Sequence, residues 1–115
     1  MFVGALMAGI GVGLGAFGAH GLRARLSPEM LAVFETAVRY QMYHSLAMLA
    51  TAALMTRVDG RAAVIAGWSF FAGIMIFSGS LYALALTGVT TLGAITPIGG
   101  LAFLIGWLAL IIAAF

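Results

Sequence analysis

The residues whose types could support chemistry are concentrated in one stretch of the sequence, residues 27–55. This stretch contains Glu29, Glu35, Arg39 and His44. Such groups can form an ion pair, bind an anion or carry a proton. On a helix, Glu35 and Arg39 are i,i+4 neighbours with the acid first, which is the favourable order for an ion pair. We therefore predict that Glu35 and Arg39 pair along one helix face.

Two tyrosines extend this arrangement. Tyr43 lies one turn beyond Arg39 on the same face, and Tyr40 and His44 form a second i,i+4 pair on an adjoining face, whereas Gln41 points elsewhere. In a structural interpretation, the ion pair, the tyrosines and His44 fasten this helix to its neighbours. In a functional interpretation, the same group binds an anion or a lipid headgroup, or passes protons through His44.

A second histidine, His20, lies between Gly18 and Gly21 in the first loop. We expect it to be an interfacial side chain bonded to a loop carbonyl or a neighbour, with titration, ligation or a partner contact as the alternative. Two histidines are too few to hold a metal without further ligands, and a haem would need His20 and His44 at similar depth. The candidate polar cluster is His20, Glu35, Arg39, Tyr40, Tyr43 and His44.

The composition is that of a membrane protein. Of 115 residues, 64% are hydrophobic and 7% charged, and mean hydropathy is +1.21. Soluble domains carry roughly a quarter charged residues, so this surface is not suited to water. The net charge of +2 comes from scattered arginines without a clustered basic face, so we expect no nucleic-acid partner. The chain has no cysteine, which excludes disulfides and thiolate chemistry.

Apolar segments separated by short polar loops predict an all-α, integral membrane four-helix bundle forming a single domain, residues 1–115. The second helix should begin with Ser27 as N-cap and Pro28 at its first position. Its first part is amphipathic and partly interfacial, and it then either turns or continues tilted into the membrane. The predicted spans are residues 1–20, 38–56, 62–87 and 97–115, with the amphipathic helix at residues 28–40.

Glycines in the first span indicate close helix packing. Gly9 and Gly13 form one GxxxG pair, and Gly11 and Gly15 form another. Small residues at this spacing let helices approach closely in lipid. Gly13, Gly15 and Gly18 also satisfy the GxGxxG pattern of dinucleotide-binding proteins, but the strand that this motif requires is missing. We therefore interpret the glycines as a packing face.

The third span is rich in aromatic residues, including Phe70, Phe77 and Tyr82. We expect these rings to pack or to contact lipid, with an apolar ligand groove as the alternative. Four spans place both termini on one side of the membrane. The two loops carry similar positive charge, so the positive-inside rule gives almost no bias, and we prefer a cytoplasmic first loop.

Two motifs resemble a known family. GAFGAHGL at residues 15–22 and LSPEMLAVFETAVRYQMYHSLAMLA at residues 26–50 look like domain-of-unknown-function family 423, which is similar to animal transmembrane protein 256. The resemblance covers essentially the whole chain. It implies a multi-pass helical protein of a bacterial inner or plasma membrane, and it brings no catalytic residues. The family pattern includes His20, Tyr40, Gln41 and His44.

No nucleophile, base and orienting group occur in a recognisable combination, so we expect no enzymatic activity, no catalytic residue, no metal and no cofactor. The expected function is that of an accessory or assembly subunit in a membrane complex or homo-oligomer, acting through glycine-rich helix faces. The alternative is a small conduit or binding protein for a proton, an ion or a lipid headgroup. A haem- or quinone-associated redox subunit is a third possibility.

Overall fold

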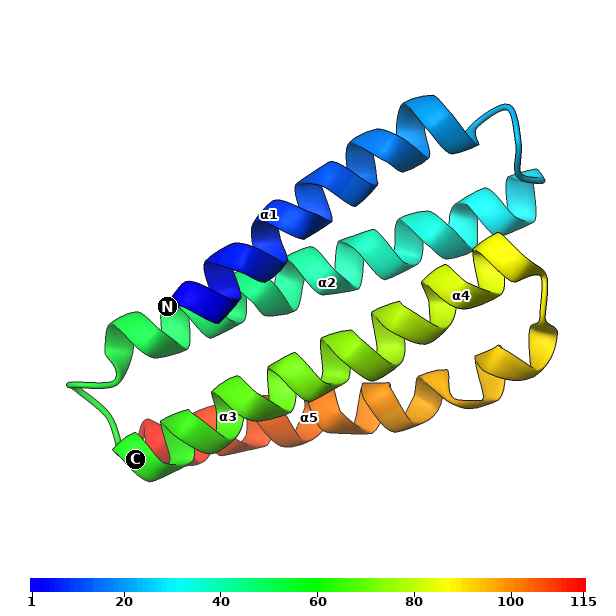
Figure 1. Ribbon diagram of the computed structural model, residues 1–115. Helices are drawn as coiled ribbons and strands as arrows, with labels where there is room; N and C mark the ends of the chain where they lie inside the picture. Colours follow the sequence, from blue (N-terminus) through cyan, green and yellow to red (C-terminus); the bar gives the residue numbers. More distant parts are fainter.

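The computed structural model describes residues 1–115 as four helical rods without strands (Figure 1). Short loops join the rods, and both termini lie at the same end (Figure 1). The first rod is α1 (Phe2–Phe17) with the π-helical turn η1 (Gly18–Leu22), and the second is α2 (Pro28–Leu54). The third consists of α3 (Gly60–Gly73), π-helical η2 (Ile74–Ser78) and α4 (Gly79–Thr87); a 3₁₀ turn, η3 (Thr90–Ala94), leads to α5 (Thr96–Ala113).

The rods pack mainly in chain order. α1 packs on α2, α2 packs on the third rod, and the third rod packs on α5. The Cα atoms span 47 × 26 × 16 Å, so the bundle is flattened. Because α1 and α5 lie at opposite edges, one side of α2 is left uncovered between them.

Three helical segments are long and apolar enough to cross a membrane: Phe2–Leu22, Gly60–Thr87 and Thr90–Ala113. α2 is less apolar than these three because its central turns carry arginine, glutamine and histidine. Its 27 residues nevertheless lie between two membrane-crossing rods. At ~1.5 Å per residue α2 is about 40 Å long, which exceeds a hydrocarbon core of about 30 Å. α2 therefore crosses as the fourth helix, and its first turns extend into the interface.

α2 begins as its sequence predicts. The Ser27 hydroxyl accepts a hydrogen bond from the Met30 N–H at 3.2 Å, and Pro28 occupies the first turn. No break separates the amphipathic segment from the span, so the helix continues rather than turns. The observed helices differ from the predicted spans by a few residues at their ends, and residues 28–40 and 38–56 merge into this one helix.

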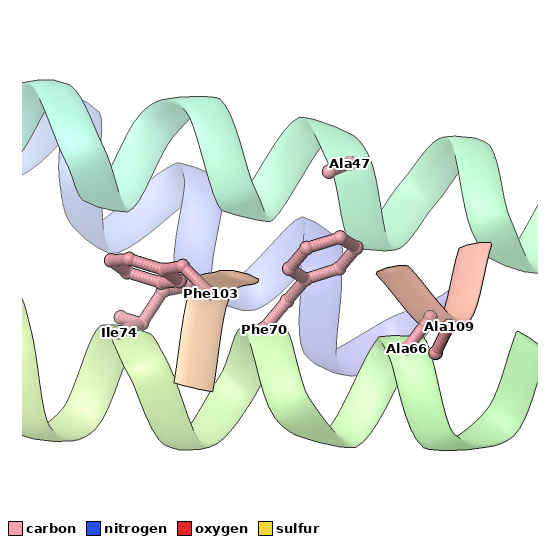
Figure 2. Packing of buried hydrophobic residues seen from close by; sticks show 6 residues of the cluster. All are labelled: Ala47, Ala66, Phe70, Ile74, Phe103 and Ala109. Carbon is pink, nitrogen blue, oxygen red and sulfur yellow. The ribbon is translucent and has the colours of Figure 1, made fainter. Parts of the chain in front are cut away.

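The third rod and α5 pack closely because phenylalanine rings of each element lie over glycines of the other. A Cβ added to Gly106 would meet the ring of Phe70 at 2.6 Å, and one added to Gly73 would meet the ring of Phe103. Figure 2 shows Phe70 and Phe103 lying between α2 and the third rod. In lipid, helices associate through such close van der Waals packing. The core cluster consists of Ala47, Ala66, Phe70, Ile74, Phe103 and Ala109.

The glycines of α1 are divided between two faces. Gly11 packs against Met42, whose Sδ would lie 2.7 Å from an added Cβ, and Gly15 packs against Val38 at 3.3 Å. This pair makes the close helix contact that the sequence predicts. Gly9 and Gly13 face outward, and an added Cβ at either would meet nothing within 4 Å. The packing expected at Gly9 and Gly13 is therefore not made within the chain.

Adjacent glycines of α5 provide a test of this packing. A Cβ on Gly99 would lie 2.7 Å from the backbone Cα of Phe77, whereas one on Gly100 would stay 3.9 Å from the Phe77 ring. We expect Gly99→Ala to destabilise the bundle by about 1–3 kcal/mol because the backbone must shift, and Gly100→Ala to be nearly neutral. Unfolding of both variants in detergent measures this difference; equal stability would contradict the packing described.

Candidate functional site

Gln41 links three of the four rods. It is 2% exposed, and its Nε2 donates to the Met7 carbonyl of α1 at 2.8 Å. Its Oε1 accepts from the Tyr82 hydroxyl of α4 at 2.8 Å. Sequence reasoning placed Gln41 on a different face from the polar cluster and did not select Tyr82, so this link was missed. Helical spacing could have identified Gln41 as a buried residue, because Phe34, Gln41, His44 and Ser45 recur at intervals typical of one buried helix face.

Three of the buried hydroxyl groups bond to backbone carbonyls of α2. Ser45 donates to the Gln41 carbonyl at 2.6 Å, and Thr51 donates to the Ala47 carbonyl at 2.8 Å. Ser78, in the π-helical turn η2, donates to the Ala37 carbonyl of α2 at 2.8 Å. This last bond ties the third rod to α2. Every buried side-chain nitrogen and oxygen of the chain has a hydrogen-bond partner.

His44 is held by two hydrogen bonds and by stacking. Trp107 of α5 donates its Nε1–H to His44 Nε2 at 3.3 Å, which assigns the ring proton to Nδ1. The Nδ1–H then donates to the Tyr40 carbonyl at 2.7 Å. The ring also stacks on Phe103, with centroids 3.5 Å apart. Both nitrogens of a neutral imidazole are therefore occupied, and sequence reasoning did not identify Trp107 as the partner.

The two histidines do not form a common site. His44 stacks on Phe103, near the midpoint of the uncharged α5, so it lies near the middle of the bilayer. His20 is exposed in η1, and its near neighbour Gly18 packs on Phe34. Phe34 is ten residues before His44, which corresponds to about 15 Å along α2. The two histidines therefore do not lie at the equal depth that coordination of one haem would require. No group of three His, Cys, Asp or Glu residues lies close enough together to hold a metal ion.

Glu35 and Arg39 lie on the uncovered side of α2, opposite the buried polar residues. Both are exposed, and neither side chain makes a hydrogen bond or ion pair within the chain, so the predicted Glu35–Arg39 pair is wrong. Tyr43, one turn further, is 55% exposed. From His44, Arg39 is about 7 Å and Glu35 about 14 Å along the axis, at 1.5 Å per residue. Arg39 therefore lies within the hydrocarbon, and Glu35 lies near its boundary.

A shallow groove between α2 and α5 lies beside this exposed side. Its walls include Tyr40, Tyr43 and Trp107, and Gly100 forms part of its α5 side. The Tyr40 ring stacks on Phe77 at 4.6 Å. Phe77 of the third rod thus serves in packing, as expected. The six residues of the predicted polar cluster do not lie together. His20 is in η1, Tyr40 and Tyr43 line the groove, His44 is on the buried face of α2, and Glu35 and Arg39 are on its outer side.

This chain is a small multi-pass helical membrane protein whose buried polar side chains all have hydrogen-bond partners within the chain. The sequence pattern of the family described as "Protein of unknown function (DUF423)" matches residues 14–100, and the chain belongs to this family. The family assignment made from the two sequence motifs is thereby confirmed.

Relatives in two bacterial genera cover nearly the whole chain. UPF0382 membrane protein YwdK of Bacillus subtilis is 49% identical over 115 residues, which cover 99% of this chain and 94% of the relative. UPF0382 membrane protein SERP0230 of Staphylococcus epidermidis is 53% identical over 116 residues, covering 98% and 92%. No solved structure matches the chain. The relatives support the assignment to a membrane.

Removing the Gln41 side chain amide should destabilise the bundle. Gln41→Leu removes both bonds to the neighbouring helices and leaves the Tyr82 hydroxyl without its acceptor in an apolar interior, at a cost of about 1–3 kcal/mol. Tyr82→Phe removes only one bond, and helix–helix hydrogen bonds in membranes average about 0.6 kcal/mol. We expect unfolding in detergent to rank the proteins as wild type, Tyr82→Phe and then Gln41→Leu in decreasing stability. A Gln41→Leu protein as stable as wild type would refute this role for the amide.

Proposed function

We propose that this protein is a non-enzymatic assembly or accessory subunit of a complex in the bacterial inner or plasma membrane. The observation that carries the proposal is the contrast between the two sides of α2. Its buried polar groups all have partners in the chain, whereas the exposed Glu35 and Arg39 have none. A charged side chain near the bilayer centre costs about 2.5–3.5 kcal/mol on insertion scales. A protein surface that supplies complementary charge would offset this cost.

The surroundings of Arg39 are suited to a helix contact. Ala32, Ala50 and Ala53 are exposed on the same side of α2. Small residues allow another helix to approach closely, and van der Waals contact then replaces contact with lipid. The outward Gly9 and Gly13 of α1 offer a second small-residue surface. These features support docking of protein on the uncovered side of the bundle.

The interior offers little support for a proton conduit. Both nitrogens of His44 are engaged, and no chain of free donors and acceptors continues from that ring. No nucleophile and base lie together, which supports a function without catalysis.

Binding of an anionic lipid headgroup is a second candidate. Arg39, Tyr40 and Tyr43 lie on neighbouring positions of α2, and the two tyrosine hydroxyls make no hydrogen bond within the chain. A guanidinium suits a phosphate group, and the long Arg39 side chain can extend along α2 from its position in the hydrocarbon toward the depth of the headgroups. A requirement for anionic lipid in the assembly test below would favour this candidate.

Isolation of the intact protein in lipid nanodiscs, followed by native mass spectrometry, tests the assembly role. We expect particles containing more than one chain, because a single copy of 11.9 kDa leaves the charged side of α2 uncovered. Glu35→Ala combined with Arg39→Ala should shift these particles toward single copies.

The matched control for this experiment is Arg57→Ala, which removes an exposed arginine of the second loop. Because this residue is outside the bundle, assembly should be unchanged. Single copies of the wild-type protein under all gentle conditions would refute the assembly role.

A further inference from the structure

The uncovered side of α2 has a regular spacing. Four of its exposed residues, Ala32, Arg39, Leu46 and Ala53, are separated by seven residues each. A seven-residue repeat is the spacing that keeps one seam of a helix facing a partner helix in a left-handed pair. We call this surface the outer seam; it consists of Ala32, Glu35, Arg39, Tyr43, Leu46, Ala50 and Ala53, all exposed.

The charges of the outer seam are complementary to themselves. Glu35 and Arg39 are one turn apart, or about 6 Å along the helix axis. In a parallel two-fold dimer each residue meets its counterpart at the same depth. Glu35 of one copy then lies one turn from Arg39 of the other, a distance that the long arginine side chain can span. The symmetry produces two such pairs, which leaves no charge of the seam alone.

A dimer contact gives the two charges surroundings that a single chain does not. In a single chain both side chains are exposed and make no ion pair with each other. Between two closely packed helices the same charges lie in a low-dielectric contact, where ionic attraction is much greater than in water. Ala32 and Ala53 near the two ends of the seam permit the close approach, and Leu46 fills the centre.

From this arrangement we propose that a second copy of this chain docks on the outer seam, forming a parallel two-fold dimer joined by reciprocal Glu35–Arg39 ion pairs. The inference rests on the assembly role proposed above and names its partner. Because the acid and the base occur on the same seam of the same chain, a second copy supplies both complementary charges without any other molecule.

Charge reversal tests the reciprocal pairs. Arg39→Glu makes the seam wholly acidic and Glu35→Arg makes it wholly basic, so either change should weaken dimerisation at least about tenfold. Glu35→Arg combined with Arg39→Glu restores both pairs in reverse order and should return the affinity to within about threefold of wild type. The measurement is energy transfer between donor- and acceptor-tagged full chains in phosphatidylcholine vesicles over a range of lipid dilutions. Arg57→Glu is the control and should leave dimerisation unchanged.

The absence of cysteine allows a second measurement of the same geometry. Leu46→Cys places a thiol at the centre of the seam, where the two-fold axis brings both copies together, and should give disulfide-linked dimers in oxidised membranes. Ile65→Cys, on an exposed side of α3, should not. Adding Arg39→Glu to Leu46→Cys should reduce the cross-link.

The outcomes separate this inference from the broader proposal. Failure of the double reversal to restore a dimer lost in both single variants, together with no cross-link at Leu46, would overturn the reciprocal pairing. If wild-type chains do not self-associate but a complex with another protein is lost on Arg39→Glu, the assembly role survives and the dimer does not. Association that occurs only when phosphatidylglycerol replaces phosphatidylcholine would assign the seam to an anionic headgroup. Monomers in every vesicle and native preparation would overturn both.

Discussion

The hydrogen bonding of Gln41 is the constraint on which the arrangement of the bundle depends. A primary amide in an apolar interior needs partners for both its ends, since water is not available to replace them. Gln41 obtains one from the α1 backbone and one from Tyr82 of α4, and these two contacts fix α1 and α4 against opposite sides of α2 at a defined height. Hydrogen bonds are directional, so they define the relative height of two helices more narrowly than dispersion forces, which act over the whole contact surface. The polar links therefore contribute positional specificity as well as stability.

The glycines set how closely the helices can approach once those links fix their height. The rings of Phe70 and Phe103 and the backbone of Phe77 lie where an additional methyl group of α5 or the third rod would collide with them. Close approach of this kind brings Trp107 within hydrogen-bonding distance of His44, although α2 and α5 are not packed directly along their backbones. The π-helical turn η2 lies in the same region and orients Ser78 toward α2. Packing and hydrogen bonding are thus coupled, because the bond between Trp107 and His44 depends on the close approach of these helices.

Much of the fold could be predicted from the sequence because helix boundaries depend on local chemistry. Ser27 and Pro28 marked the start of α2, Pro97 marked the start of α5, and hydropathy separated the spans. The predicted Glu35–Arg39 pair failed because i,i+4 spacing shows that two side chains can meet, whereas their environment decides whether they do. The partners of Gln41 and His44 could not be predicted, because Met7 and Trp107 come from segments 34 and 63 residues away. Sequence spacing describes one helix at a time, and these contacts depend on how several helices pack.

The buried and exposed sides of α2 carry different kinds of polar side chain within one short stretch of sequence. The buried side requires neutral groups with fixed partners, and Gln41, His44 and Ser45 meet that requirement. Removing Glu35 and Arg39 would leave those contacts intact, so the exposed charges are not needed to hold this bundle together. Hydrophobic residues would be more stable at the same positions in a lipid-facing helix. Glu35 and Arg39 make no side-chain hydrogen bond or ion pair within the chain, which is the basis of the proposed interaction outside it, and their depth would restrict that interaction to groups that can enter the membrane. The outer side of α2 is therefore the surface on which the proposed assembly role depends.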